Sequence, residues 1–411
     1  MTDRNKKILF AVFFFLFSIG MGYGLYWMFF RAQLPGAPAQ TPEELTGQLP
    51  GAGQGIPGQY ATPTTPGGLP TAEGTLPLVP EGPGTAQEVS KIQLLHDGVT
   101  QAVSPLPDGN GARFYNPEDG RFYKISPDGQ TVLLGDKQFF NVNNVNWGKT
   151  KDEVILEFPD NSKVFYDFNA KKQVTLPSHW EDFDFAPDDS RVVSKSIGVD
   201  PNNRFLITAQ PDGTEAKAIE PVSDPALAHS SWSPAGQIIA YGETGTTQPE
   251  NQQEILFVGQ NHENFPSIVV PGRGFTPNWS PTGKQLMYSV WNQNTNNKPS
   301  LWISAAEPAN LGANRRAFNL QTWADKCTWA SETDVYCGVP QDLPDNAGLS
   351  RSDFATLPDD VYHLDLTTGI STKLDLPDLT HAIRSPVMNR DKSKLIFSDA
   401  STGKLYSYDV K

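Results

Sequence analysis

The chain has 411 residues, with 46 Asp and Glu against 32 Lys and Arg, which gives a formal net charge of −14. Nucleic acids and anionic lipid surfaces attract basic protein faces, so this charge argues against tight binding to either. We therefore expect no nucleic-acid partner.

An apolar segment lies near the start of the sequence. Ile8–Phe30 contains no charged residue, and a helix rising about 1.5 Å per residue would cross a bilayer over that length. Basic residues precede it and aromatic residues lie near its far end: Arg4, Lys6 and Lys7, then Tyr23, Tyr26 and Trp27. This pattern predicts cytoplasmic residues 1–7, a single-pass anchor at 8–30 and an extracytoplasmic remainder. A signal peptide cleaved near Ala37–Ala39 is the alternative, although the apolar run is long for one.

Residues 31–87 are dominated by Pro and Gly with Thr, Ala and Gln. Such a segment has no periodic apolar face and cannot bury enough surface to fold. It predicts a disordered linker that tethers the following domain to the membrane.

A repeated phrase marks that domain. Trp232–Tyr241 reads WSPAGQIIAY, and Trp279–Tyr288, 47 residues later, reads WSPTGKQLMY. The Ser-Pro-x-Gly core is typical of a tight turn, with Pro fixing φ, and apolar residues on either side indicate two strands. A period of this size built from strands predicts a β-propeller, and we expect the tryptophans to fill the wedges between blades.

Weaker copies of the phrase complete the ring. Similar hairpins begin near five other positions: Val103, Trp147, Phe185, Trp329 and Val387. A third, alternating strand and a fourth, more polar strand follow most of the hairpins. The sequence thus predicts an all-β, seven-bladed propeller of four-stranded blades over residues 88–411. The last unit lacks a fourth strand, so residues 89–95 are expected to supply it and close the ring.

Two cysteines flank the sixth hairpin. Cys327 and Cys337 are equidistant from the turn at Glu332, which places them opposite each other on paired strands. Outside the membrane a disulfide is favoured, with two buried free thiols as the alternative.

The Trp-Ser-Pro-x-Gly-x-x-apolar-x-Tyr phrase resembles the TolB-like propeller repeat, also called PD40 or WD40-like. The resemblance is sharp over residues 228–290 and weaker elsewhere. It implies a ring that binds ligands or proteins, since TolB itself docks a peptidoglycan-associated lipoprotein within an envelope assembly. TolB has six blades and an additional α/β domain, whereas this sequence predicts seven blades, an anchor and a tether. Peptidases of the prolyl oligopeptidase type also carry the repeat, but no hydrolase domain fits in this chain.

The sequence contains no nucleophile elbow, zinc-binding His-Glu-x-x-His motif or phosphate-binding glycine loop. We expect neither an enzyme nor a cofactor. Candidate binding residues instead lie in or near the loops that lead into the innermost strands, which gather around the channel mouth: His179, Trp180, His229, Arg273, Phe275, Trp323, Lys326, His381 and Arg384. Aromatic and Arg residues there suit a binding hot spot, although capping of strand ends explains them equally well. The three histidines would also allow a metal site, which we do not favour.

Three long connections are expected on the same face, at Glu243–Gln253, Trp291–Pro299 and Gly338–Asp360. Long loops without secondary structure are often functional, and Trp291 adds an aromatic candidate. Loop drift under no constraint is the alternative. We therefore expect a membrane-anchored scaffold that binds an envelope protein or a polar peptide or glycan ligand. The alternative is a glycan- or peptide-processing enzyme, or a glycan-binding module, that uses the mouth of the propeller channel. Oligomeric state does not follow from the sequence.

Overall fold

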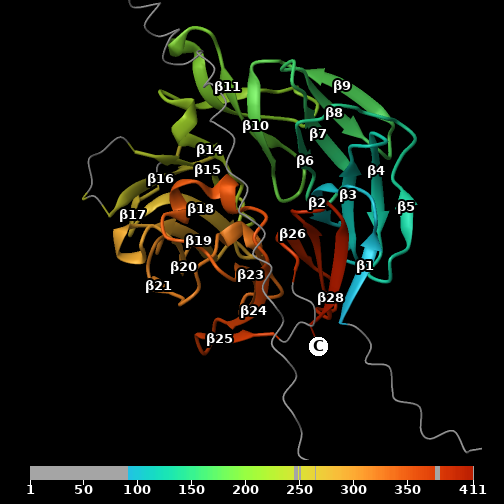
Figure 1. Ribbon diagram of the computed structural model, residues 1–411. Helices are drawn as coiled ribbons and strands as arrows, with labels where there is room; N and C mark the ends of the chain where they lie inside the picture. The colour runs from blue at the N-terminus through green and yellow to red at the C-terminus, as the bar shows by residue number, and fades with distance from the viewer. Residues whose placement is uncertain (1–90, 245–248, 250, 264, 375–379, 411) are drawn as a thin grey trace, which may run out of the picture. The chain divides into compact units, whose positions relative to one another are not determined.

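The computed structural model describes residues 91–410 except 245–248, 250, 264 and 375–379. The expected anchor and tether at 1–87 therefore lie outside the described residues. Within the described ranges, strands form seven antiparallel sheets of four strands each. The sheets follow one another around a ring, with strands such as β2, β10 and β26 nearer its centre and β5, β9 and β21 at its edge (Figure 1). No helix in these ranges is both long and apolar enough to span a bilayer.

Each of the first six blades is built from four consecutive strands, which run in order from the centre outward. The first blade has β2 (Gln101–Pro105), β3 (Ala112–Asn116), β4 (Arg121–Ile125) and β5 (Thr131–Leu133). The second has β6 (Asn144–Trp147), β7 (Glu153–Glu157), β8 (Lys163–Asp167) and β9 (Lys172–Leu176). The third has β10 (Trp180–Phe185), β11 (Val192–Ile197), β12 (Arg204–Ala209) and β13 (Lys217–Pro221).

The fourth blade has β14 (Ala228–Ser230), β15 (Ile238–Glu243), β16 (Gln253–Gly259) and β17 (Ile268–Val270). The fifth has β18 (Arg273–Trp279), β19 (Gln285–Trp291), β20 (Pro299–Ala305) and β21 (Arg316–Ala317). The sixth has β22 (Cys327–Trp329), β23 (Asp334–Pro340), β24 (Asp359–Asp365) and β25 (Ile370–Lys373). Short 3-10 helices lie in the connections: η1 (Pro201–Asn203), η2 (Pro225–Leu227), η3 (Gln293–Thr295), η4 (Ala324–Lys326), η5 (Ala347–Leu349) and η6 (Arg351–Phe354).

The repeated phrase forms the hairpin between the first two strands of a blade. The amide of Gly283 donates to the carbonyl of Ser280 at 2.8 Å, and Gly236 makes the same bond to Ser233. Both glycines have positive φ, +71° and +81°, which explains the requirement for Gly at the fourth turn position. Trp232 is buried in a core cluster that includes residues of the third and fourth blades, as expected for a residue that fills the wedge between blades.

The ring closes through a strand from the start of the domain. The seventh blade consists of β26 (Ile383–Met388), β27 (Lys394–Asp399), β28 (Leu405–Asp409) and, at its outer edge, β1 (Ile92–His96). β1 pairs antiparallel with β28, the position that the sequence analysis assigned to residues 89–95. Leu95 joins a buried cluster shared by the first and seventh blades, and the amide of Thr100 donates to Gly403 O at 2.7 Å. The two ends of the domain are thus held in one sheet and one core.

Candidate functional site

The three long connections emerge at one end of the ring, which we call the loop face. In the fifth blade, Arg273 at the start of β18, Trp291 at the end of β19 and Pro299 at the start of β20 are register partners. The loop into the innermost strand and the loop between the second and third strands therefore share an edge. The bounds match the sequence expectation except in the sixth blade, where β23 continues to Pro340 and the loop is Gln341–Pro358. These connections also carry secondary structure that was not expected, η3, η5 and η6, because Asn, Asp and Ser side chains in loops favour local turns.

Backbone hydrogen bonds join the loops of the fifth and sixth blades. Gly348 N donates to Asn297 O at 2.7 Å, and Asn346 N donates to Asn296 O at 2.8 Å. The side-chain amide of Asn297 adds a bond to Asn346 Oδ1 at 2.8 Å. Since each loop satisfies polar groups of the other, the pair forms one ordered surface.

A cavity of about 320 Å³, the loop pocket, opens where all three long connections meet. Its lining combines amide side chains with an indole, a guanidinium and one leucine: Asn251, Arg273, Trp291, Asn292, Gln293, Asn297 and Leu349. Leu349 is 58% exposed, so its side chain can be reached from solvent. The pocket thus presents apolar and hydrogen-bonding groups side by side.

Two glycines make room for the indole of Trp291. A Cβ placed on Gly348 would lie 2.4 Å from Trp291 Cγ, and one on Gly274 would lie 2.5 Å from Trp291 Nε1. Both distances are far below van der Waals contact, so any larger residue would displace the ring. The position of Trp291 is therefore set by close approach of the backbone on both sides.

A second cavity on the loop face, the basic pocket, has a volume of about 250 Å³. It is lined by Trp323, Asp325, Lys326, Arg351, Ala355, Ile383, Arg384, Ser385 and Ala400. Three of these residues are basic and one is acidic. Arg351 forms a two-bond ion pair with Asp325, at 2.8 and 2.7 Å, and lies 5.0 Å from the centre of the Trp323 ring. The loop Gln341–Pro358 separates the two pockets, because it supplies Leu349 to one and Arg351 to the other.

Behind the basic pocket lies a buried ion pair. Lys326 Nζ is 2.7 Å from Asp359 Oδ2, and both side chains are almost fully buried. Burial raises the pKa of Asp359 to about 6 even though Lys326 opposes the shift. Asp359 Oδ2 also accepts the Ile383 amide at 2.6 Å, whereas its Oδ1 atom has no partner among the described residues. The carboxylate thus connects the sixth and seventh blades at the pocket wall.

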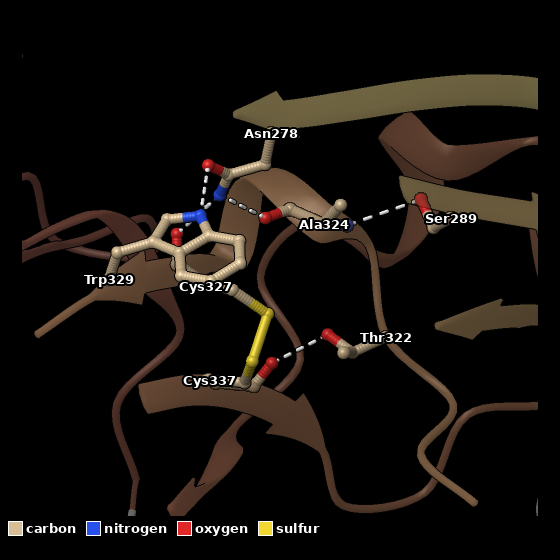
Figure 2. Close-up of a disulfide and its surroundings, with 8 residues drawn as sticks. Asn278, Ser289, Thr322, Ala324, Cys327, Trp329 and Cys337 are labelled. Carbon is tan, nitrogen blue, oxygen red and sulfur yellow. Dashed lines mark hydrogen bonds between the residues drawn. A yellow bond between two sulfur atoms is a disulfide. The ribbon is translucent and has the colours of Figure 1, made fainter. Parts of the chain in front are cut away.

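The disulfide holds the segment that carries Trp323, Asp325 and Lys326. Cys327 and Cys337 are register partners of β22 and β23 and form a disulfide. Figure 2 shows the surroundings of the bridge, in which Asn278 of β18 donates to Ala324 O and Cys327 O at 2.8 and 2.9 Å. The indole of Trp329 completes the set by donating to Asn278 Oδ1 at 3.0 Å. η4 is therefore fixed from two blades, and the lining residues that it carries are fixed with it.

The three candidate histidines lie in separate surroundings. His179 is exposed, His229 stacks on Tyr241 with ring centres 4.9 Å apart, and His381 Nδ1 is 3.2 Å from Asp399 Oδ2. Burial lowers the pKa of His229. In the part of the protein that the structure describes, no group of three or more His, Cys, Asp or Glu residues could hold a metal ion. The histidine metal site considered from the sequence is not assembled there.

Two aromatic candidates belong to the core. Trp180 and Phe275 are only 5% exposed and pack in clusters between blades. The expectation that they belong to a binding face was wrong, because each points between sheets at the start of its innermost strand. Trp323 and Lys326 are also largely buried but do line the basic pocket, together with Arg384.

The remaining candidates, Arg273 and Trp291, meet in the loop pocket. Leu349 and Arg351 are lining residues that the sequence did not name individually, although it did name the connection Gly338–Asp360 that carries them. They lie in η5 and η6, in a segment without strand periodicity. A third cavity, of about 660 Å³, is lined by Trp232 and Trp279 with prolines of the repeated turns. It lies among residues of the innermost strands and the hairpins that follow them.

Comparison with family models and with curated sequences finds no match. Solved structures do share the fold. An oligogalacturonate lyase in complex with manganese is 12% identical with a TM-score of 0.54, over 78% of this chain and 93% of that one. An oligogalacturonate lyase from Vibrio parahaemolyticus is 13% identical with a TM-score of 0.50, over 78% and 93%. The Cps50 (Swd1) β-propeller domain from Myceliophteria thermophila is 11% identical with a TM-score of 0.50, over 78% and 98%. At these identities the likeness establishes a seven-bladed β-propeller and nothing about activity.

Proposed function

We propose that this protein is a scaffold of the cell envelope that binds a partner protein through its loop face. One observation carries the proposal: the long connections of three consecutive blades meet at a single pocket. Exposed Leu349 and the indole of Trp291 supply apolar contact there, and Arg273 supplies a guanidinium. Aromatic and Arg side chains of this kind account for most of the energy in protein interfaces.

The order of the loops supports the proposal. The backbone bonds of Gly348 and Asn346 to the neighbouring loop hold the surface in one conformation. A surface that is ordered before binding loses less conformational entropy when a partner docks. The amides of Asn292 and Asn297 already bond within the protein and stiffen the pocket wall, and the side chain of Asn251 at the rim would add a hydrogen bond to a peptide segment.

Placement in the envelope rests on the sequence. The apolar run at 8–30 would anchor the protein with residues 1–7 in the cytoplasm, and the Pro- and Gly-rich segment at 31–87 would tether the propeller outside. The TolB-like repeat phrase points to the same compartment. In this proposal the propeller acts by binding and not by catalysis.

A glycan-binding or glycan-processing role is the second candidate. The loop pocket carries amides next to an indole, a combination that also suits the hydroxyls and the apolar face of a sugar ring. Two of the solved structures described above are oligogalacturonate lyases. A processing enzyme would show turnover of a polysaccharide or peptide, which a scaffold would not.

The test is affinity capture by the full-length protein in detergent, incubated with solubilised envelope of the native cells. One variant replaces Gln341–Pro358 by a short Gly-Ser linker, which removes a wall of both pockets. A control replaces Glu307–Asn310, the largely exposed start of the connection between β20 and β21 at the other end of the blades, and keeps Leu311, which packs against the core. A partner retained by the full-length protein and the control, and lost from the first variant, is the expected result. Equal capture by all three would contradict the proposal.

A further inference from the structure

The lining of the basic pocket differs from the rest of the protein in its balance of basic and acidic residues. The net charge of the whole sequence is −14, yet this cavity is lined by Lys326, Arg351 and Arg384 against Asp325 alone. Clefts that concentrate one sign of charge within low-dielectric walls attract ligands of the opposite sign. Asp359 lies beside Lys326 and Asp399 acts on Arg384 from outside the lining, so what the pocket attracts depends on which cation is left uncompensated.

The three cations differ in how they are compensated. Arg351 is paired with Asp325 through two hydrogen bonds, and Lys326 is paired with Asp359 at 2.7 Å. The guanidinium of Arg384 instead donates from Nη2 to Thr100 O at 3.1 Å and to Ser398 Oγ at 3.2 Å. Among the described residues, Arg384 forms no ion pair. Both hydrogen bonds of its guanidinium are made by Nη2, so the other nitrogens make none within the described ranges. Arg384 is thus the cation with donors left for a ligand.

Arg384 can be reached from solvent but is partly desolvated. As a whole the residue is exposed, yet desolvation of its guanidinium lowers the pKa of Arg384, with Asp399 opposing the shift. A guanidinium that is partly removed from water gains more from a direct anion contact than a fully hydrated one does. Its planar donor geometry matches a carboxylate, which can accept two parallel hydrogen bonds.

The remaining walls identify the kind of anion. Trp323, Ile383, Ala355 and Ala400 are apolar, and Ser385 is the one neutral side chain with a hydroxyl in the lining. An acidic sugar ring would bury several hydroxyls against these walls without partners, which is costly. The methylene or apolar part of an amino acid loses no hydrogen bonds there.

We propose that the basic pocket binds a carboxylate of a peptide ligand, with the guanidinium of Arg384 as its main partner and the apolar walls around the adjoining carbon atoms. The carboxylate is either an Asp or Glu side chain or the C-terminus of a polypeptide. The proposal rests on the protein-binding function above and assigns part of that ligand to a defined cavity.

The experiment is a ligand-observed NMR titration of the full-length protein in detergent micelles with four small probes. N-acetyl-leucine carries only an α-carboxylate, and the α-amide of N-acetyl-glutamate carries only a side-chain carboxylate. The diamide of N-acetyl-glutamate is the neutral control, and D-galacturonate represents an acidic sugar. At least one of the two amino-acid carboxylates should bind about tenfold or more tightly than the neutral probe, as a charge-assisted pair requires. The stronger of the two identifies the source of the carboxylate.

Three variants connect binding to the pocket. Arg384→Gln should weaken the preferred probe about tenfold. Ala355→Glu puts a competing carboxylate on an exposed rim position, breaks no side-chain hydrogen bond and should weaken it similarly. Arg390→Gln, an exposed arginine in the hairpin between β26 and β27, should change nothing.

Equal binding of charged and neutral probes, or unchanged binding by Arg384→Gln and Ala355→Glu, would overturn the proposal. Tighter binding of D-galacturonate than of both amino-acid probes would overturn its peptide part. Loss in Arg390→Gln would show a general charge effect and would also overturn it. Failure of this proposal can be told apart from failure of the scaffold function. If only the carboxylate proposal is wrong, the Arg384→Gln variant still captures the partner, and the variant without Gln341–Pro358 still does not.

Discussion

Leu95 offers a direct test of ring closure by β1. It is 8% exposed and packs in the cluster shared by the first and seventh blades, whereas neighbouring Leu94 is 47% exposed. Truncating a buried leucine to alanine costs about 2 to 5 kcal/mol. We expect Leu95→Ala to lose about 3 kcal/mol of unfolding free energy, near the middle of that range. For a domain of this size that corresponds to about 4 °C in melting temperature.

Leu94→Ala is the matched control, because it removes the same atoms from the same strand on the exposed side. Its loss should stay below about 1 kcal/mol, since exposed substitutions have small effects. Urea unfolding of residues 88–411, followed by tryptophan fluorescence and by circular dichroism, measures both variants. If Leu95→Ala unfolds at the same urea concentration as Leu94→Ala, β1 does not carry the closure and the reasoning fails.

Three further predictions concern the site. Denatured, unreduced protein should show no free thiol, and replacing both Cys327 and Cys337 by Ser should cost about 3 kcal/mol for a loop of this length. The pKa of Asp359 is raised to about 6 in the folded protein, so wild type loses unfolding free energy as pH rises from about 4 and Asp359 ionises. Asp359→Asn has no such ionisation, and its unfolding free energy should therefore rise relative to wild type between pH 4 and pH 7. Gly348→Ala should displace Trp291 and reduce partner capture.

For each of these predictions, one result would contradict it. Two labelled thiols in the denatured protein would disprove the disulfide. A stability difference between Asp359→Asn and wild type that is constant with pH would show that Asp359 has an ordinary pKa. For Gly348→Ala the control is Gly242→Ala, whose new Cβ would come no closer than 3.5 Å to Leu227 O. Equal capture by both glycine variants would remove the role assigned to Trp291.

The blade architecture could be predicted because its determinants are local. The turn after Trp279 needs Gly at position 283 for its positive φ, and the flanking apolar runs follow directly in the sequence. The pairing of Cys327 with Cys337 is likewise determined by counting from one hairpin. Predicting the outer strand of the last blade required only the assumption that a closed ring leaves no unpaired strand edge.

The site was less predictable because its contacts are not local. Gly348 N donates a hydrogen bond to Asn297 O, about fifty residues away in the sequence, and no periodic pattern of residues predicts such a bond. Length alone indicated that the loops matter, but not that Leu349 and Arg351 would face different pockets. Trp180 and Phe275 were misplaced because a residue in the first part of an innermost strand can point to the core or to the channel mouth.

The measurement that tests the scaffold role most directly is the affinity of the captured partner for wild type and for Trp291→Ala. The two proteins are first shown to have the same melting temperature, so that a change in affinity does not reflect unfolding. A central aromatic residue of an interface contributes about 2 kcal/mol or more, which is about thirtyfold in Kd. A loss of that size would establish the loop pocket as the centre of the binding surface. An unchanged Kd, with the partner still bound, would place the interface elsewhere on the propeller.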